Sequence, residues 1–157
     1  MKISRRRLLS VLVAAAAGSV TALPALSDAA AVPPPPQRND IKFMVVEEAL
    51  AAGVPVDLAL AVAKVQSDFK SQALGSEGAR GVMQISPGTA RADYGVATEE
   101  LWDPQINIQI GIDMLATLRD RYDGDWNLAL SHFERGPLDV VEGEPIAHPG
   151  SAAFLSQ

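Results

Sequence analysis

Proline and glycine stand in this sequence at the points where helices can begin and end. Ser86-Pro87 and Asp103-Pro104 each join a capping side chain to a proline, which suits the first turn of a helix and breaks later turns. Glycine follows the apolar-periodic stretches and supplies their stops, at Gly53, Gly95, Gly124 and Gly136. This punctuation predicts short helices joined by tight connections.

Five short helices are predicted in this way. They cover about residues 40–52, 55–69, 87–94, 104–122 and 126–135. Asn39 or Asp40 is expected to cap the first helix, and Pro55 suits the first turn of the second. A further short helical piece is expected around residues 82–85, within a glycine-rich loop.

Apolar residues recur at helical spacing and not at strand spacing. One face of the second helix is predicted to carry Leu58, Val62, Val65 and Phe69. The core face of the fourth helix is predicted to carry Ile108, Ile112, Leu115, Leu118 and Tyr122. No stretch shows sustained period-two alternation, so no sheet is predicted. A chain of 157 residues has room for one domain, and its predicted fold class is all-α.

Residues 1–29 have the features of an export signal. The basic cluster Arg5-Arg6-Arg7 precedes an apolar run over residues 8–17, and small residues near 29–31 suit a signal peptidase. The apolar run falls short of the ~20 residues that span a bilayer as a helix. The arginines before it also resemble the twin-arginine export signal of bacteria. We expect cleavage near residues 29–31, export to the periplasm and no stable membrane anchor; an uncleaved anchor is the alternative.

A proline-rich spacer follows the signal. Val32-Pro33-Pro34-Pro35-Pro36-Gln37 can form neither a helix nor a central strand, because proline lacks an N–H and restricts the residue before it. We expect a linker over residues 30–38 and one folded domain over residues 39–157. The tail after Pro137 is broken by proline and glycine, and only residues 151–157 are expected to begin another helix.

Charge and cysteine content exclude several function classes. Removal of residues 1–29 takes four of the thirteen lysines and arginines and one of the nineteen acids, which leaves nine bases against eighteen acids. Such an acidic domain repels nucleic acid, so no nucleic-acid partner is expected. The absence of cysteine excludes disulfides, thiolate metal sites and thiol nucleophiles. His132 and His148 lie sixteen residues apart, which is not a zinc-ligand spacing, so no metal or cofactor is expected.

Gln66 lies on the shoulder of the apolar face of its predicted helix, about 80° from Leu58. Its amide is expected to be partly buried and to need hydrogen-bond partners. On periodicity alone, Gln66 is interpreted as a core-edge glutamine that the backbone satisfies. Gln84, in a loop bounded by glycines, invites the same interpretation.

Three separated blocks of residues match one family in order. The first, Ala61-Val62-Ala63-Lys64-Val65-Gln66-Ser67-Asp68-Phe69, resembles a family helix that ends in Glu-Ser-x-Phe. The second, Gly78-Ala79-Arg80-Gly81-Val82-Met83-Gln84-Ile85-Ser86-Pro87-Gly88-Thr89-Ala90, is close to Gly-Ala-x-Gly-Leu-Met-Gln-Leu-x-Pro-x-Thr-Ala, and Leu101-Trp102-Asp103-Pro104 follows as a family helix start. The third, Ala129-Leu130-Ser131-His132-Phe133-Glu134-Arg135-Gly136-Pro137, corresponds to Ala-Leu-Ala-x-Tyr-Asn-x-Gly-Pro. Residues 55–137 therefore resemble the lysozyme-like domain of soluble lytic transglycosylases (SLT), bacterial enzymes that cut peptidoglycan strands.

The resemblance implies a lysozyme-like fold and an action on the β-1,4 bond between N-acetylmuramic acid and N-acetylglucosamine. Family members use one glutamate as general acid and then as general base, and they leave 1,6-anhydro ends without a metal or cofactor. That glutamate's position is Gln66 here. A primary amide can neither give nor take the proton, and losing general acid–base help costs ~10²–10⁴-fold. Phe133 also replaces the family tyrosine, and Glu134 replaces an asparagine.

Other positions of the implied groove match the family. Ser67, Met83 and Gln84 occupy family positions and are expected, with Phe133, to bind the glycan strand. Sugar binding needs shape, amides and apolar faces but no proton transfer. The resemblance therefore favours a glycan-binding protein whose cleavage is lost or strongly weakened by Gln66, that is, a pseudoenzyme.

Two alternatives remain open. Glu134 is a candidate displaced acid, because the position that it takes lies in the family's cleft, and it would make the protein an active lytic transglycosylase. The other alternative is a module that binds cell-envelope or secretion-apparatus proteins and no glycan. Asp68 lies about 200° from Gln66 around the helix and is expected to point away from the cleft. The remaining loop acids are interpreted as solvated charges, at Glu77, Glu99 and Glu100.

Overall fold

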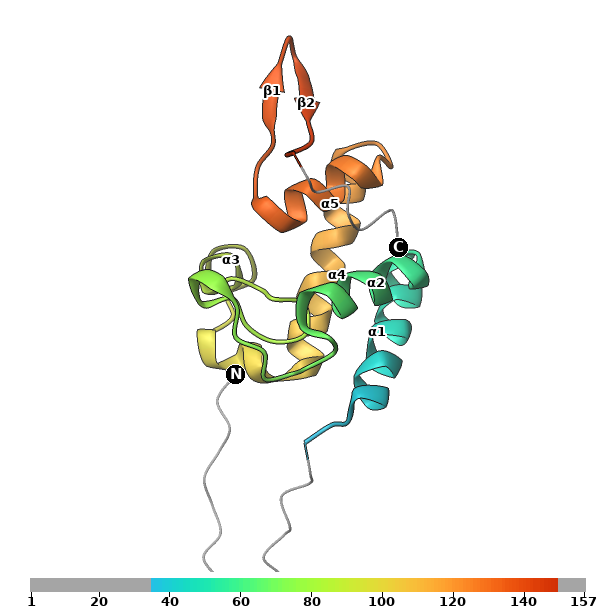
Figure 1. Cartoon of the computed structure of the whole chain (residues 1–157), viewed down its shortest axis with the longest axis vertical. Coiled ribbons are helices and arrows are strands. Elements are labelled where there is room, and N and C mark those ends of the chain that lie inside the picture. The colour runs from blue at the N-terminus through green and yellow to red at the C-terminus, as the bar shows by residue number, and fades with distance from the viewer. Residues whose placement is uncertain (1–34, 150–157) are drawn as a thin grey trace, which may run out of the picture. The chain divides into compact units, whose positions relative to one another are not determined.

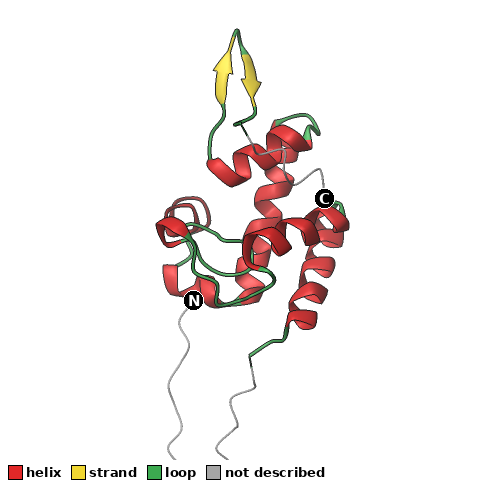
Figure 2. Ribbon diagram, viewed as in Figure 1, coloured by secondary structure: helices red, strands yellow, loops and turns green. Residues whose placement is uncertain are grey.

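The computed structural model describes residues 35–149, which all belong to the second of two units, Pro34–Gln157. The expected signal peptide, most of the spacer and the segment 151–157 lie outside the described residues. Five α-helices form the domain (Figure 1), and they are α1 (Arg38–Ala52), α2 (Val56–Ser67), α3 (Pro87–Tyr94), α4 (Pro104–Arg121) and α5 (Trp126–Arg135). Two short 3₁₀ helices and a hairpin complete it, namely η1 (Ser76–Gly78), η2 (Thr98–Trp102), β1 (Asp139–Val141) and β2 (Glu144–Ile146). The mostly helical architecture confirms the predicted all-α class (Figure 2). In the described part of the chain, no helix is both long and apolar enough to cross a membrane.

Side-chain caps fix the starts of the later helices. Ser86 Oγ accepts the Thr89 N–H at 3.0 Å at the start of α3. Asp103 Oδ1 accepts the N–H groups of Gln105 and Ile106 at the start of α4. Both caps were predicted, and each satisfies donors that the first turn of a helix leaves free.

The start of α1 differs from the prediction. Gln37 precedes the first turn, and its N–H donates to Asp40 Oδ2 at 2.8 Å. Asp40 therefore reaches back from the third helical position and does not itself cap the helix. The expectation that Asn39 or Asp40 caps this helix is wrong by two or three residues.

The core forms around α4, which packs against α1 and α5, while α2 packs against α1 (Figure 1). Ile108, Ile112 and Leu115 are fully buried on α4, as predicted. On α2 the buried face follows Ala59, Val62, Ala63 and Ser67, whereas Val65 is 50% exposed. The prediction for Val65 is wrong, because the buried face of α2, which packs against α1, runs through Ala59, Val62 and Ala63.

The loop between α2 and α3 contains no helical piece at residues 82–85, in contrast to the prediction. Arg80 forms isolated bridges with Leu74 and Ile85, and its N–H donates to the Ile85 carbonyl at 3.0 Å. Positive φ angles at Gly81 (78°) and Gln84 (53°) are incompatible with helix continuation. A sharply folded loop therefore replaces the expected helix.

The Asn107 side chain on α4 is hydrogen-bonded to the backbone of this loop. It is fully buried, and its Nδ2 donates to the carbonyls of Arg80 (2.8 Å) and Leu101 (3.1 Å). Its Oδ1 accepts the Met83 N–H at 2.8 Å. One buried amide thus joins the loop, η2 and α4.

A β-hairpin follows α5, although no sheet was predicted. β1 and β2 pair antiparallel with Val141 opposite Glu144, and Glu142 (φ 54°) and Gly143 (φ 90°) form the turn. Two successive positive φ angles characterise the tight turn that matches the twist of a two-stranded hairpin. Strands of three residues are too short to show the alternation on which the prediction relied.

Candidate functional site

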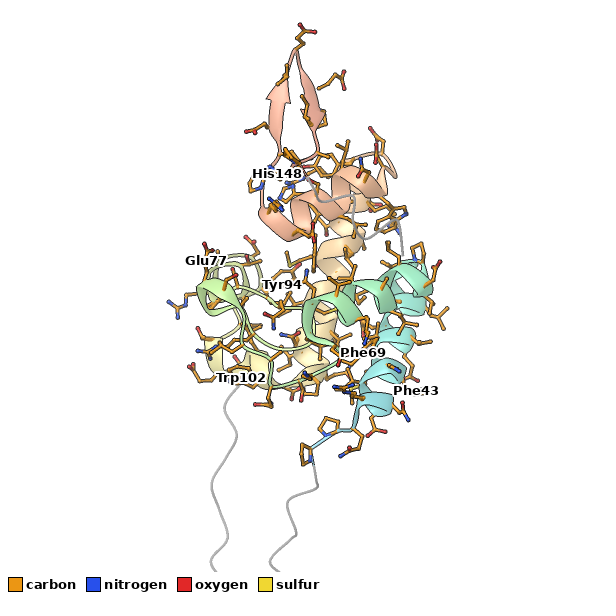
Figure 3. The ribbon with its side chains drawn as sticks, in the orientation of Figure 1. Phe43, Phe69, Glu77, Tyr94, Trp102 and His148 are labelled. Carbon is orange, nitrogen blue, oxygen red and sulfur yellow. The ribbon has the colours of Figure 1, made fainter. Side chains whose placement is uncertain are left out.

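A pocket of about 620 Å³ opens between α5 and the segment from η1 to α3. This volume lies within the range of small-molecule sites. Figure 3 labels Glu77, which lies in η1 and lines the pocket, and His148, which lies near the base of the hairpin. The pocket is lined by Ser76, Glu77, Ala79, Gln84, Ile85, Ser86, Thr89, Asp93, Met114, His132, Phe133, Glu134, Arg135, Gly136 and Pro137.

Three carboxylates lie on the pocket wall, at Glu77, Asp93 and Glu134. Partial burial raises the pKa of Glu134 above its ordinary value, against the opposing effect of the neighbouring Arg135. Burial raises a carboxyl pKa because it disfavours the charged form. Glu134 is thus an acidic group in the pocket that holds its proton more tightly than a solvated glutamate does.

Gln84 is fixed in place before any ligand arrives. Its Nε2 donates to the carbonyls of Ala73 (3.1 Å) and Gly81 (2.9 Å). Gly75 makes room for this amide, since a Cβ on Gly75 would lie 2.0 Å from Gln84 Oε1. The backbone of Gln84 itself is left-handed, with φ 53°. The loop therefore presents one amide in a single orientation at the pocket.

Gln66 lies half-buried in the last turn of α2 and does not line this pocket. Among residues 35–149, no side-chain hydrogen bond satisfies its amide, so the interpretation of Gln66 as a backbone-satisfied core glutamine is not supported. Its neighbour Ser67 is buried and donates to the Val82 carbonyl at 2.8 Å. That bond ties the end of α2 to the loop that carries Gln84. The Gln66 amide itself has no side-chain hydrogen bond within the described residues.

Met83 is fully buried and lies against Gly111 of α4, where an added Cβ would come within 2.5 Å of the Met83 side chain. It has no exposed surface with which to contact a glycan, so it supports the loop from within. Of the six residues singled out in the sequence, the pocket brings together Gln84, Phe133 and Glu134.

Asp68 lies away from the pocket, as expected. It caps α2 in a left-handed conformation and pairs with Lys64 and with Arg38 (2.7 Å). The hydrogen bond from Lys64 lowers the pKa of Asp68 most, burial opposes it, and the charges of Arg38, Lys64 and Lys70 lower the pKa further. This carboxylate is engaged in joining α2 to the start of α1.

Two other acids also serve the fold. Glu99 pairs with Arg80 at 3.5 Å and is 81% exposed, and Glu100 accepts the Ala97 N–H at 2.8 Å. These contacts agree with the interpretation as surface loop charges. Glu77 is exposed as well, but it stands on the pocket rim.

Sequence reasoning missed Glu77, Asp93 and His132 as pocket residues. The Tyr122 hydroxyl lies 2.7 Å from His132 Nδ1, and burial, followed by the charges of Arg121 and His148, lowers the pKa of His132. The spacing of Asp93 and Thr89, four residues apart on α3, was the available signal for a shared helix face. Within 35–149, no group of three or more histidine and carboxylate side chains could hold a metal ion.

Comparisons with known proteins converge on one family. The model of the family described as "Transglycosylase SLT domain" matches residues 43–145. Lytic transglycosylase Slt from Pseudomonas aeruginosa, in an inactive glutamate-to-glutamine mutant, is 31% identical over 60% of this chain and 16% of that one, with a TM-score of 0.55. The 70-kDa soluble lytic transglycosylase from Escherichia coli is 25% identical over 62% of this chain and 16% of that one, with a TM-score of 0.52. A complex of the 70-kDa enzyme with bulgecin A matches at the same identity and coverage, with a TM-score of 0.53.

The chain spans about a sixth of the length of these solved enzymes, since it covers 16% of each. The fold is shared with their corresponding segment, and the family match extends over most of the described residues, from α1 through the hairpin. The chain belongs to the transglycosylase SLT domain family.

Proposed function

We propose that this domain binds peptidoglycan glycan strands and that its cleavage of them is lost or strongly weakened. The observation that carries the proposal is Gln66, an amide at the position where the family resemblance places the catalytic glutamate. An amide cannot protonate the leaving oxygen or accept a proton afterwards. One of the similar structures is an inactive lytic transglycosylase mutant with glutamine in place of glutamate, which supports the view that this exchange removes activity.

The binding half of the proposal is supported by the pocket beside α5. Its wall combines the fixed amide of Gln84, the apolar ring of Phe133 and several polar side chains at the rim. Amides and ring faces are the groups that recognise sugars, and a preformed pocket keeps the entropic cost of binding low. The free amide of Gln66 adds a donor and an acceptor near the loop that Ser67 anchors.

A second candidate function is an active lytic transglycosylase that uses Glu134 as a displaced acid. Two observations favour it: Glu134 lines the pocket, and partial burial raises its pKa. A general acid must hold its proton near neutral pH, and a raised carboxyl pKa moves in that direction. Phe133 next to it lacks the hydroxyl that the family tyrosine would offer.

Digestion of purified sacculi distinguishes the two functions. The purified protein and the variants Glu134→Gln and Gln66→Ala are incubated with sacculi, and soluble 1,6-anhydromuropeptides are measured by mass spectrometry. We expect no product above the buffer control and co-sedimentation of the protein with sacculi. Product that disappears with Glu134→Gln would establish the displaced acid. Absence of both product and co-sedimentation would indicate a module that binds only proteins.

We also infer that the protein acts in the periplasm, where peptidoglycan is accessible, and that cell-envelope or secretion-apparatus proteins are its further partners. The support is the basic and apolar N-terminal sequence, with its resemblance to a twin-arginine signal. Mass spectrometry of the protein recovered from a periplasmic fraction tests this inference. A mature N-terminus near residues 29–31 is expected, and an intact Met1 in the cytoplasmic fraction would overturn it.

A further inference from the structure

The β1–β2 hairpin extends beyond α5, and none of the helices within residues 35–149 covers its strands (Figure 1). Every strand residue is exposed except Pro145, which is half-buried. Its apolar side chains include Val140 at 65% exposure, Val141 at 53% and Ile146 at 47%. At the base, the His148 N–H donates to the buried Ser131 Oγ at 2.7 Å and fastens the hairpin to α5. An isolated two-stranded hairpin is marginally stable in water. The exposed apolar side chains of this hairpin add no stabilising burial to it.

The two outer edges of the hairpin differ in what their backbones offer. The two-residue turn makes Val141 and Glu144 a hydrogen-bonded pair, so the next pair, Val140 and Pro145, directs its backbone groups outward. Proline has no N–H, which blunts the β2 edge. Val140 has both an N–H and a carbonyl, and neither has a partner among residues 35–149. The β1 edge is therefore the one that can accept another strand.

The acidic side chains of the hairpin determine which side chains a strand added at the β1 edge should carry. Asp139, Glu142 and Glu144 form no ion pair within the described part of the chain. Asp139 and Val141 lie on the same face of β1, because side chains two residues apart share a face. An added strand would place its side chains opposite this acid and this valine. Basic and apolar residues complement these positions, whereas a second copy of the acidic hairpin would bring like charges together.

We propose that the outer edge of β1 is a docking site for an extended segment of a partner protein that carries basic and apolar side chains. The segment adds as a strand: its backbone pairs with the N–H and carbonyl of Val140, and its basic side chains lie beside Asp139 and Glu142. Because Gly136 and Pro137, which line the pocket, lie just before β1, a partner docked here would sit beside the glycan site. Docking at this edge is independent of whether the pocket binds glycan.

The test uses the purified full chain, labelled with ¹⁵N, and two blocked eight-residue peptides. One peptide alternates lysine with valine, and the other has glutamate in place of lysine. Amide hydrogen exchange and chemical shifts are followed residue by residue. We expect the lysine peptide to slow exchange of the Val140 N–H at least tenfold at saturation, and the glutamate peptide to have no effect at the same concentration.

Three variants separate strand addition from general attraction to an acidic protein. Val140→Pro removes the N–H and should weaken binding of the lysine peptide at least tenfold, while the matched Val140→Thr keeps the N–H and should bind as the parent does. The double substitution Asp139→Lys with Glu142→Lys reverses the two charges beside the added segment and should reverse the preference in favour of the glutamate peptide. This keeps the test decisive if proline disturbs the hairpin.

Several outcomes would overturn the proposal. Equal binding of the lysine peptide to Val140→Pro, with the hairpin still folded, would show attraction without strand addition. A concentration-dependent dimer that Val140→Pro abolishes would assign the edge to a second copy. Stronger peptide binding after deletion of residues 150–157 would assign it to the chain's own terminus.

Discussion

Ser67 Oγ, in the last turn of α2, donates a 2.8 Å hydrogen bond to the carbonyl of Val82 in the loop before α3. Both residues are buried, so water cannot replace the bond. Through it the helix that carries Gln66 and the loop that carries Gln84 are held in one relative position. The arrangement of the two amides thus depends on a residue that is not available to a ligand.

Ser67→Ala should destabilise the domain by about 1–3 kcal/mol, because the buried Val82 carbonyl loses its donor. Urea unfolding followed by circular dichroism measures the change. The control is Ser71→Ala, since Ser71 has no side-chain hydrogen bond within the described residues and should change stability by less than about 0.5 kcal/mol. Equal effects of the two substitutions would contradict the assigned role of Ser67.

Gly75→Ala should weaken sacculus binding with a smaller effect on folding. The new Cβ would meet Gln84 Oε1 at 2.0 Å and displace that amide from its fixed position. Loss of one hydrogen bond to the ligand corresponds to about tenfold in affinity. Gly88→Ala is the matched control, because its nearest neighbouring atom would lie 3.7 Å away. Unchanged co-sedimentation of Gly75→Ala would show that Gln84 does not contact the glycan.

Gln66→Glu should confer or increase lytic activity. The substitution supplies a carboxyl that can give and take a proton, and general acid–base catalysis contributes ~10²–10⁴-fold. Release of 1,6-anhydromuropeptides from sacculi is the measurement, with Gln109→Glu on the exposed face of α4 as the control. If glycan binding persisted without any product, the changes at Phe133 and Glu134 would also have disabled the site.

The stability difference between the parent protein and Glu134→Gln should depend on pH. Burial raises its pKa in the folded state above the ordinary value of 4.5, so folding favours the protonated form. Its favourable contribution is present below pH 4.5 and is lost as the pH rises through the folded-state pKa. Glu134→Gln should therefore raise the urea midpoint relative to the parent at pH 7, and less so at pH 4. Glu144→Gln, on the exposed hairpin, is the control. A larger increase of the urea midpoint for Glu134→Gln at pH 4 than at pH 7 would contradict a raised pKa of Glu134 in the folded state.

Local signals account for the parts of the fold that the sequence predicted. Ser86 and Asp103 cap their helices through bonds to residues two or three positions away, so adjacent letters of the sequence suffice. The exposure of Val65 was not predictable in this way, because contact with α1 selects the buried face of α2. The hairpin was not predictable for a different reason: its strands have three residues each, too few to show periodicity, and Glu142-Gly143 is not one of the usual hairpin turn pairs.

The candidate site was only partly predictable. Gln84, Phe133 and Glu134 came from the family resemblance, since no rule of spacing joins residue 84 to residues of α5. Glu77 and Asp93 reach the same pocket through the folding of separate segments, which a single sequence does not reveal. The role of Gln66 stays a prediction, because it rests on the resemblance and on the chemistry of the amide.

The buried amide of Asn107 has a consequence for how such a protein can change over generations. It fastens the loop to α4 through two hydrogen bonds, and a third joins it to Leu101 of η2. The shape of the loop therefore depends on Asn107 and not on the side chains at positions 66 and 133. Under the proposed function, a substitution at position 66 would change the chemistry without loosening this loop, because the two depend on different side chains.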